Sequence, residues 1–125
     1  MAKYLLDSMI LIDHLNGASQ ATTWLADLKP DEALISVITR AEVLVGCGDQ
    51  WETVAAFLEE YTCLGIGADE ADMAAALRNK YQIKLPDAFQ AALASHQDLT
   101  LVTRDHDGFK KIEGLEIKIP YKLHP

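Results

Sequence analysis

The sequence has few cysteines, no long apolar run and too few basic residues to balance its acidic ones. Cys47 and Cys63 do not have the spacing of metal ligands, and two thiols in a chain of this size argue against a disulfide framework and favour a reducing compartment. No stretch approaches the roughly 20 apolar residues that a membrane span needs. Asp7 and Asp13 interrupt the first apolar segment, so we expect no signal peptide. These absences predict a cytoplasmic protein without membrane segments.

The charge balance limits how the chain can bind nucleic acid. It has 19 acidic and 11 basic residues, with a formal net charge of −8. Affinity for nucleic acid rests largely on neutralising phosphates, so binding would need a metal ion or a local cluster of basic residues. Half of the 125 residues are apolar, which argues against disorder, and the length predicts one domain over residues 1–125.

Short apolar runs alternate with longer amphipathic segments along the chain. This alternation predicts an α/β fold, in which helices cover both faces of a mainly parallel sheet of four or five strands. The expected strands are 4–6, 33–36, 61–66, 99–103 and 116–119, and the expected helices are 8–15, 18–28, 37–46, 49–60, 69–81 and 86–96.

Four acidic residues lie at or near the ends of these elements. Asp7 follows the first strand, Glu42 lies in the helix after the second, Asp87 begins the last helix, and Asp105 follows the fourth strand. In a parallel sheet the carboxyl ends of the strands share one edge, where open α/β sheets bind ligands. We therefore expect these carboxylates to converge.

Each acid also has an ordinary structural explanation. Asp7 would cap the helix that follows it, and Thr39 with Glu42 fits a capping box. Asp87 suits the positive end of a helix dipole, and Asp105 suits a turn. These explanations account for each residue separately but not for their joint placement.

Glu42 is the most informative of the four. Ile38, Ala41 and Val45 lie about one turn away from it, so we expect it on an apolar helix face. A carboxylate buried there must be paired, protonated or bound to a cation.

Converging carboxylates repel one another, and at least one pKa should rise. Mg²⁺ or Mn²⁺ would convert this repulsion into coordination, because hard cations prefer oxygen ligands. Such an ion can activate water and stabilise charge on a phosphoryl group. The pattern therefore indicates metal-assisted hydrolysis of a phosphodiester.

The acidic motifs, in this order, resemble the PIN domain family and specifically the small VapC-type toxins of bacterial toxin–antitoxin pairs. The similarity extends over essentially the whole chain. The motifs that carry it are Leu6-Asp7-Ser8, the set Ser36, Thr39 and Glu42, Pro86-Asp87-Ala88 followed by Ala91-Ala92, and Asp105 followed by Phe109.

The resemblance implies a three-layer α/β/α fold and an Mg²⁺- or Mn²⁺-dependent endoribonuclease. Its catalytic and metal-binding quartet would be Asp7, Glu42, Asp87 and Asp105, with Asp7 and Asp87 as direct metal ligands. Ser8 would hydrogen-bond near Asp7. It further implies a homodimer inhibited by a small antitoxin protein that packs a helix on its surface.

Two positions depart from the family pattern. Met9 stands where many members have asparagine, and Gly108 stands where an aspartate is often found. Asp107 is a candidate outer carboxylate in place of the latter. Neither change removes a member of the quartet, so we expect activity.

Basic residues adjacent to the acids are candidates for holding RNA phosphates. Arg40, Lys84 and Arg104 lie close in sequence to Glu42, Asp87 and Asp105, and Lys110 and Lys111 would add to them. The alternative is that they are solvated surface charges. His106 lies between two aspartates and is interpreted as a turn residue.

Other functions fit less well. A haloacid-dehalogenase-type phosphatase needs an aspartate two residues after Asp7, where Met9 stands. A phosphoacceptor receiver domain needs paired acids after the first strand and a lysine after a late one, where Thr103 and Arg104 stand. The alternative from a different class is a PIN-like partner-binding module with little or no nuclease activity.

Overall fold

The computed structural model describes residues 3–123. In chain order the elements are β1 (Tyr4–Leu6), α1 (Ser8–Leu15), α2 (Ser19–Ala26), β2 (Ala33–Ser36), α3 (Val37–Val45), the short 3-10 helix η1 (Gly48–Gln50), α4 (Trp51–Leu58), β3 (Thr62–Leu64), α5 (Ala68–Tyr81), α6 (Leu85–Gln97), β4 (Thr100–Val102), α7 (His106–Phe109) and β5 (Ile117–Lys118). No helix in this range is long and apolar enough to cross a membrane.

The strands form one parallel sheet in the order β3-β2-β1-β4-β5. Leu5 pairs with Leu34 of β2 on one side and with Leu101 of β4 on the other. The chain builds outward from β1 in both directions, so the strand order reverses between β1 and β4. A crevice forms at such a point, beyond the carboxyl ends of the strands.

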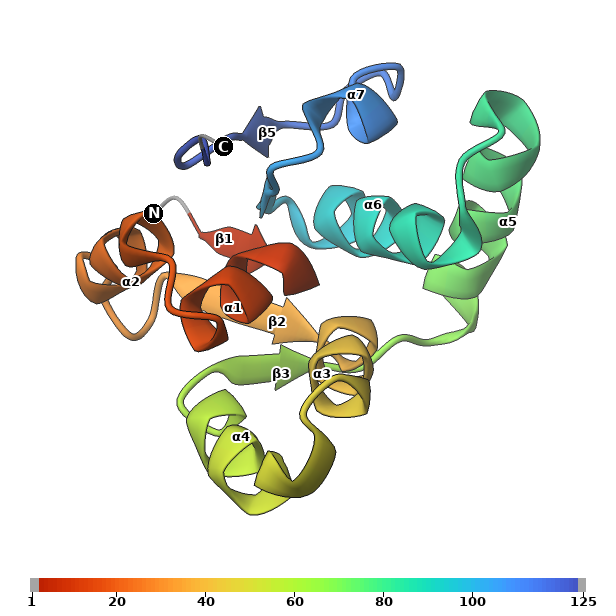
Figure 1. Cartoon of the computed structure of the whole chain (residues 1–125). Coiled ribbons are helices and arrows are strands. Elements are labelled where there is room, and N and C mark those ends of the chain that lie inside the picture. Colours follow the sequence, from red (N-terminus) through yellow and green to blue (C-terminus); the bar gives the residue numbers. More distant parts are fainter. Residues whose placement is uncertain (1–2, 124–125) are drawn as a thin grey trace.

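Helices cover both faces of the sheet, and alternate strand residues point into two cores. Leu5 and Leu101 pack with α5, α6 and Phe109 of α7, whereas Leu6 and Val102 pack with α1, α3 and α4. In Figure 1, α5 and α6 lie together on one side of the molecule and α1 to α4 on the other. The expected three-layer α/β/α fold with a parallel sheet is therefore confirmed.

Several expected boundaries changed. The helix expected over 18–28 is Ser19–Ala26, and the third strand covers only Thr62–Leu64. The helix α7 was not expected, because we interpreted its sequence as a turn. Trp51, at the start of α4, is 55% exposed.

Candidate active site

Asp7 lies at the carboxyl end of β1, next to β4. Its side chain is the N-cap of α1, since Oδ1 accepts a hydrogen bond from the Ser8 amide at 2.8 Å. Oδ2 accepts from the Thr103 hydroxyl at 2.7 Å. Asp7 is only 7% exposed, and this burial raises the pKa of its carboxyl despite the two donors. The helix-cap explanation is therefore correct, and the side chain still faces other carboxylates.

Thr103 joins Asp7 to Asp105. Its hydroxyl oxygen accepts from the Asp105 amide at 3.0 Å while it donates to Asp7. The exposed Asp105 carboxylate turns back to cap α7, accepting from the Gly108 amide at 3.0 Å. A Cβ at position 108 would lie 2.6 Å from Asp105 Oδ2, so any larger residue there would force the Asp105 side chain to move.

Asp87 lies half-buried in the first turn of α6. Its pKa rises to about 6, first because burial removes water and then because Asp7, Asp105 and Glu42 are negatively charged. Lys84 offsets part of this effect. The structure therefore brings the four acids of the expected quartet close enough to act on one another.

Glu42 reaches this group from α3, but not as expected. It is exposed, whereas the buried residues of α3 are Thr39 and Val43. The capping box was also wrong, because Ser36 caps the helix and accepts from the Thr39 amide at 3.0 Å. Partial burial of the Glu42 carboxyl and the negative charge of Asp7 still raise its pKa. A hydrogen bond from the Ser8 side chain opposes the rise.

A buried hydrogen-bond network, which the sequence did not lead us to expect, lies behind the acids. Ser36 Oγ donates to Gln90 Oε1 at 2.7 Å, and Gln90 Nε2 donates to Thr39 Oγ1 at 2.7 Å. Thr39 in turn donates to the Leu6 carbonyl at 3.2 Å. The network joins α3, α6 and β1, so it fixes the elements that carry Glu42, Asp87 and Asp7. Its sequence signal is Gln90, a polar residue flanked by Phe89 and by Ala91 and Ala92 in α6.

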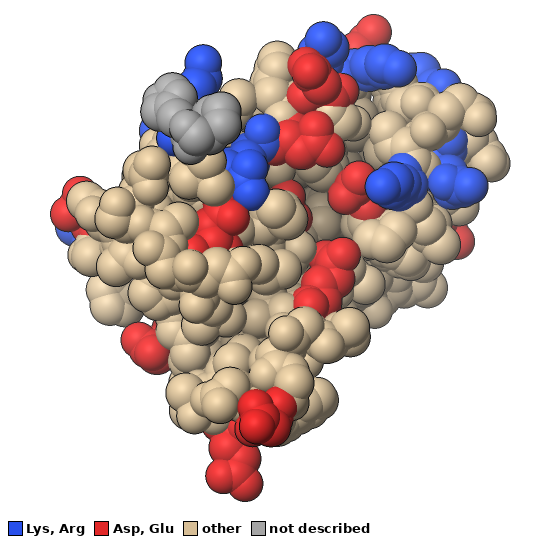
Figure 2. All heavy atoms as spheres, viewed as in Figure 1, with Lys and Arg blue, Asp and Glu red and all other residues tan. Residues whose placement is uncertain are grey.

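Several of the other candidates are already paired within the chain. Arg40 pairs with Glu59 at 3.4 Å, and the guanidinium of Arg104 pairs with Asp13. Asp107 is exposed and pairs with Lys110 at 3.1 Å. In Figure 2, acidic side chains surround the hollow at the centre of the face, and basic side chains gather over α5, α6 and α7.

The donor set suits a hard divalent cation. Burial and the negative charge of neighbouring carboxylates raise the pKa of Asp7, Glu42 and Asp87, and a cation among them would relieve the repulsion. Between residues 3 and 123, no three His, Cys, Asp or Glu side chains are already arranged to hold a metal. Mg²⁺ typically binds through one or two carboxylates and keeps several waters.

The model of the PIN domain family matches residues 4–115. The chain belongs to the PIN domain family. It is 34% identical to Ribonuclease VapC10 of Mycobacterium tuberculosis in an alignment of 119 residues that covers 90% of this chain and 90% of that protein. The resemblance to VapC-type toxins seen in the sequence is thereby confirmed.

Solved structures support the same assignment. A toxin–antitoxin complex from Klebsiella pneumoniae contains a chain with a TM-score of 0.86 and 35% identity, covering 97% of this PIN domain and 100% of that chain. FitAcB from Neisseria gonorrhoeae has a TM-score of 0.81 at 24% identity, covering 96% and 99%, and shares the fold.

Proposed function

We propose that this PIN domain is a VapC-type endoribonuclease that cleaves RNA phosphodiesters with Mg²⁺ or Mn²⁺, and that it is the toxin of a toxin–antitoxin pair. The observation that carries the proposal is the convergence of four carboxylates at the crevice between β1 and β4, where the pKa of Asp87 rises to about 6. The ribonuclease named among its relatives and the toxin–antitoxin complex among its structural neighbours support the proposal.

In this proposal Asp7 and Asp87 would hold the cation directly, and Glu42 and Asp105 would complete the acidic site around it. The cation would lower the pKa of a bound water and stabilise negative charge on the phosphodiester. The Ser8 amide and the Thr103 hydroxyl keep the buried Asp7 oriented and favour its ionised form. Asp107, now paired with Lys110, is an outer carboxylate.

The proposed partners are RNA, a small antitoxin and a second copy of the chain. Large apolar side chains on α3 and at the start of α4 remain exposed, including Val37 (41%), Val45 (84%) and Trp51 (55%). Exposed apolar surface of this kind is typical of protein interfaces. The same observation favours the second candidate function, a PIN-like module that binds a partner and does not cleave RNA.

Cleavage of a mixed RNA pool by purified, antitoxin-free protein tests the proposal. Mn²⁺ or Mg²⁺ is compared with a chelator, for the wild type, for Asp7→Asn and for the control Asp27→Asn at the exposed end of α2. We expect metal-dependent cleavage that Asp7→Asn abolishes and Asp27→Asn retains. Folded protein that binds an antitoxin but cleaves no RNA would instead support the binding module.

A further inference from the structure

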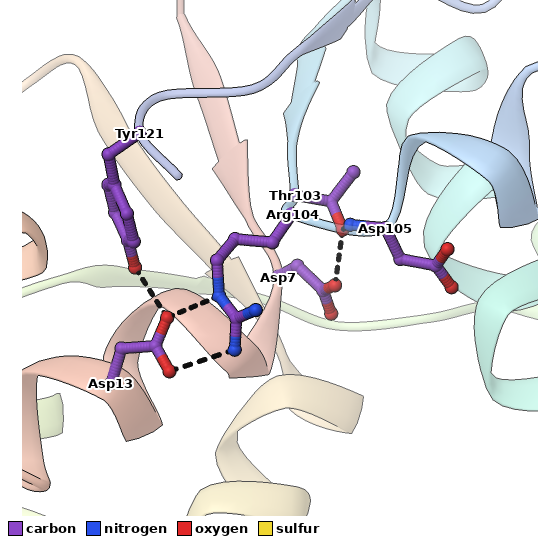
Figure 3. A network of polar contacts seen from close by, with 6 residues as sticks. All are labelled: Asp7, Asp13, Thr103, Arg104, Asp105 and Tyr121. Carbon is purple, nitrogen blue, oxygen red and sulfur yellow. Dashed lines mark hydrogen bonds and ion pairs between the residues drawn. The ribbon is translucent and has the colours of Figure 1, made fainter. Parts of the chain in front are cut away.

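A second polar cluster lies beside the quartet (Figure 3). Asp13, on the last turn of α1, has a side chain that is only 7% exposed. Arg104 donates from Nε to its Oδ2 and from Nη2 to its Oδ1, the latter at 3.0 Å. The Tyr121 hydroxyl also donates to Oδ2, at 2.8 Å. Three segments far apart in sequence therefore meet at one buried carboxylate.

We propose that Asp13, Arg104 and Tyr121 are positioning residues for the carboxylate site. They fix the segment between β4 and α7, and thereby hold Thr103 and Asp105 against Asp7. The inference rests on the proposed function, because it assigns these residues a role in the same site.

The covalent order of the segment supports this role. Arg104 lies between Thr103, which donates to Asp7, and Asp105, whose amide donates back to Thr103. A change in the backbone at Arg104 must therefore move one or both of its neighbours. A small displacement of a catalytic group is costly, since about 1 Å of misplacement can reduce a rate by about a hundredfold.

Helix α1 provides the fixed reference for this segment. Asp7 caps its amino end and Asp13 lies near its carboxyl end. The segment after β4 is attached at both places, through Thr103 to Asp7 and through Arg104 to Asp13. Two attachments to one rigid helix restrain its orientation as well as its position.

Tyr121 connects the segment that follows β5 to the same carboxylate. The strand β5 before it has only two residues, Ile117 and Lys118. The hydroxyl of Tyr121 therefore anchors the residues after β5 and completes the hydrogen bonding of Asp13 Oδ2. A planar guanidinium paired bidentately with a carboxylate is also a geometrically specific contact.

The pairing argues against a primary role of Arg104 in RNA binding. Its side chain is 26% exposed and points at Asp13 rather than outward. The neighbouring carboxylate cancels its charge, which weakens its attraction for a phosphate. A positioning role predicts a change in kcat and metal affinity, whereas phosphate binding predicts a change in KM.

The test uses Asp13→Asn and Tyr121→Phe in the full chain. Each has a matched control elsewhere: Glu59→Gln breaks the exposed pair with Arg40, and Tyr81→Phe removes a hydroxyl that accepts from the Glu113 amide. Circular dichroism is used to find a temperature at which every variant is folded, and the assays are run at that temperature. The measurements are kcat and KM for RNA, the Kd for Mn²⁺ by calorimetry, and hydrogen exchange at the Asp105 amide.

For Asp13→Asn we expect kcat to fall about tenfold with KM nearly unchanged. The Kd for Mn²⁺ should rise and exchange of the Asp105 amide should accelerate, with smaller changes of the same sign for Tyr121→Phe and none in the controls. Folded variants with wild-type kcat, Mn²⁺ Kd and exchange would overturn the inference, and so would a rise in KM alone.

If Asp13→Asn does not fold, Tyr121→Phe decides the question by the same three measurements. Failure of the proposed function can be distinguished from failure of the positioning role. A wild type that binds Mn²⁺ but cleaves no RNA would reject the nuclease, while Mn²⁺ affinity and exchange at Asp105 would still show whether the three residues position the site.

Discussion

Replacing Asp87 by asparagine should stabilise the metal-free protein. Burial and three neighbouring negative charges raise the pKa of Asp87 from its ordinary 3.8 to about 6. A carboxyl that binds its proton more tightly in the folded state than in the unfolded state lowers stability as it ionises. The cost is therefore absent below about pH 4, grows as pH rises, and is complete above about pH 6.

The size of the effect follows from the shift. About two pKa units correspond to about 3 kcal/mol if taken whole. Asp87 is half-exposed, so solvent screening reduces this to about 1–2 kcal/mol. For a chain of 125 residues the melting temperature should rise by about 5 °C near neutral pH. Asparagine has the same shape and carries no charge, so it removes the cost.

Thermal unfolding in chelator, followed from about pH 4 to about pH 7.5, tests this reasoning. The stability difference between Asp87→Asn and the wild type should appear as pH rises and be small at the acid end. The variant Asp31→Asn, at an exposed turn position, serves as the control. Added Mn²⁺ should stabilise the wild type more than Asp87→Asn. A variant no more stable than the wild type near neutral pH, or equally stabilised at the acid end, would refute the reasoning.

Three further changes have defined outcomes. Thr103→Val removes the hydroxyl that donates to the buried Asp7, so urea titration near neutral pH should give a loss of about 2 kcal/mol, and an unchanged midpoint would contradict this. Gly108→Ala places a Cβ 2.6 Å from Asp105 Oδ2 and displaces the cap of α7. The usual gain of about 1 kcal/mol for alanine over glycine in a helix should therefore be absent, and a clear rise in melting temperature would argue against the cap. Gln90→Leu leaves two buried hydroxyls without their amide partner and should cost about 2–4 kcal/mol in the same titration, so stability equal to the wild type would show that the network contributes little.

The fold and the four acids were predictable because their signals are local. Each strand is a short apolar run, and each acid lies within a few residues of the end of an element. The limits β1 at Tyr4–Leu6, α1 at Ser8–Leu15 and β2 at Ala33–Ser36 follow from caps and turn residues near them. The helix α7 escaped prediction because Asp105-His-Asp-Gly has the composition of a turn. The helix is shown by two bonds: the Gly108 amide donates to the Asp105 side chain, and the Lys110 amide donates to the His106 carbonyl.

The predicted orientation of Glu42 was wrong for a physical reason. Apolar neighbours placed it on the buried face, yet α3 buries Thr39 and Val43 instead. A polar Thr39 can face the core because Gln90 and the Leu6 carbonyl satisfy its hydroxyl. Those partners come from other elements, and no local pattern indicates them.

The contacts that complete the site are distant in sequence. Thr103 and Asp7 are 96 residues apart, and Arg104 and Asp13 are 91 apart. Asp13 and Tyr121 carry no local signal of a role near the carboxylates. Their place follows from the parallel pairing of β4 with β1 and with β5, which brings α1 and the residues after β5 beside the segment after β4.

Calorimetric titration of Mn²⁺ into the metal-free protein tests most directly whether the four carboxylates form one cation site. The wild type should bind Mn²⁺, and Asp7→Asn and Asp87→Asn should each lose most of the affinity while Asp31→Asn keeps it. Undiminished binding by folded Asp87→Asn would contradict the account, because the ion would then lie elsewhere.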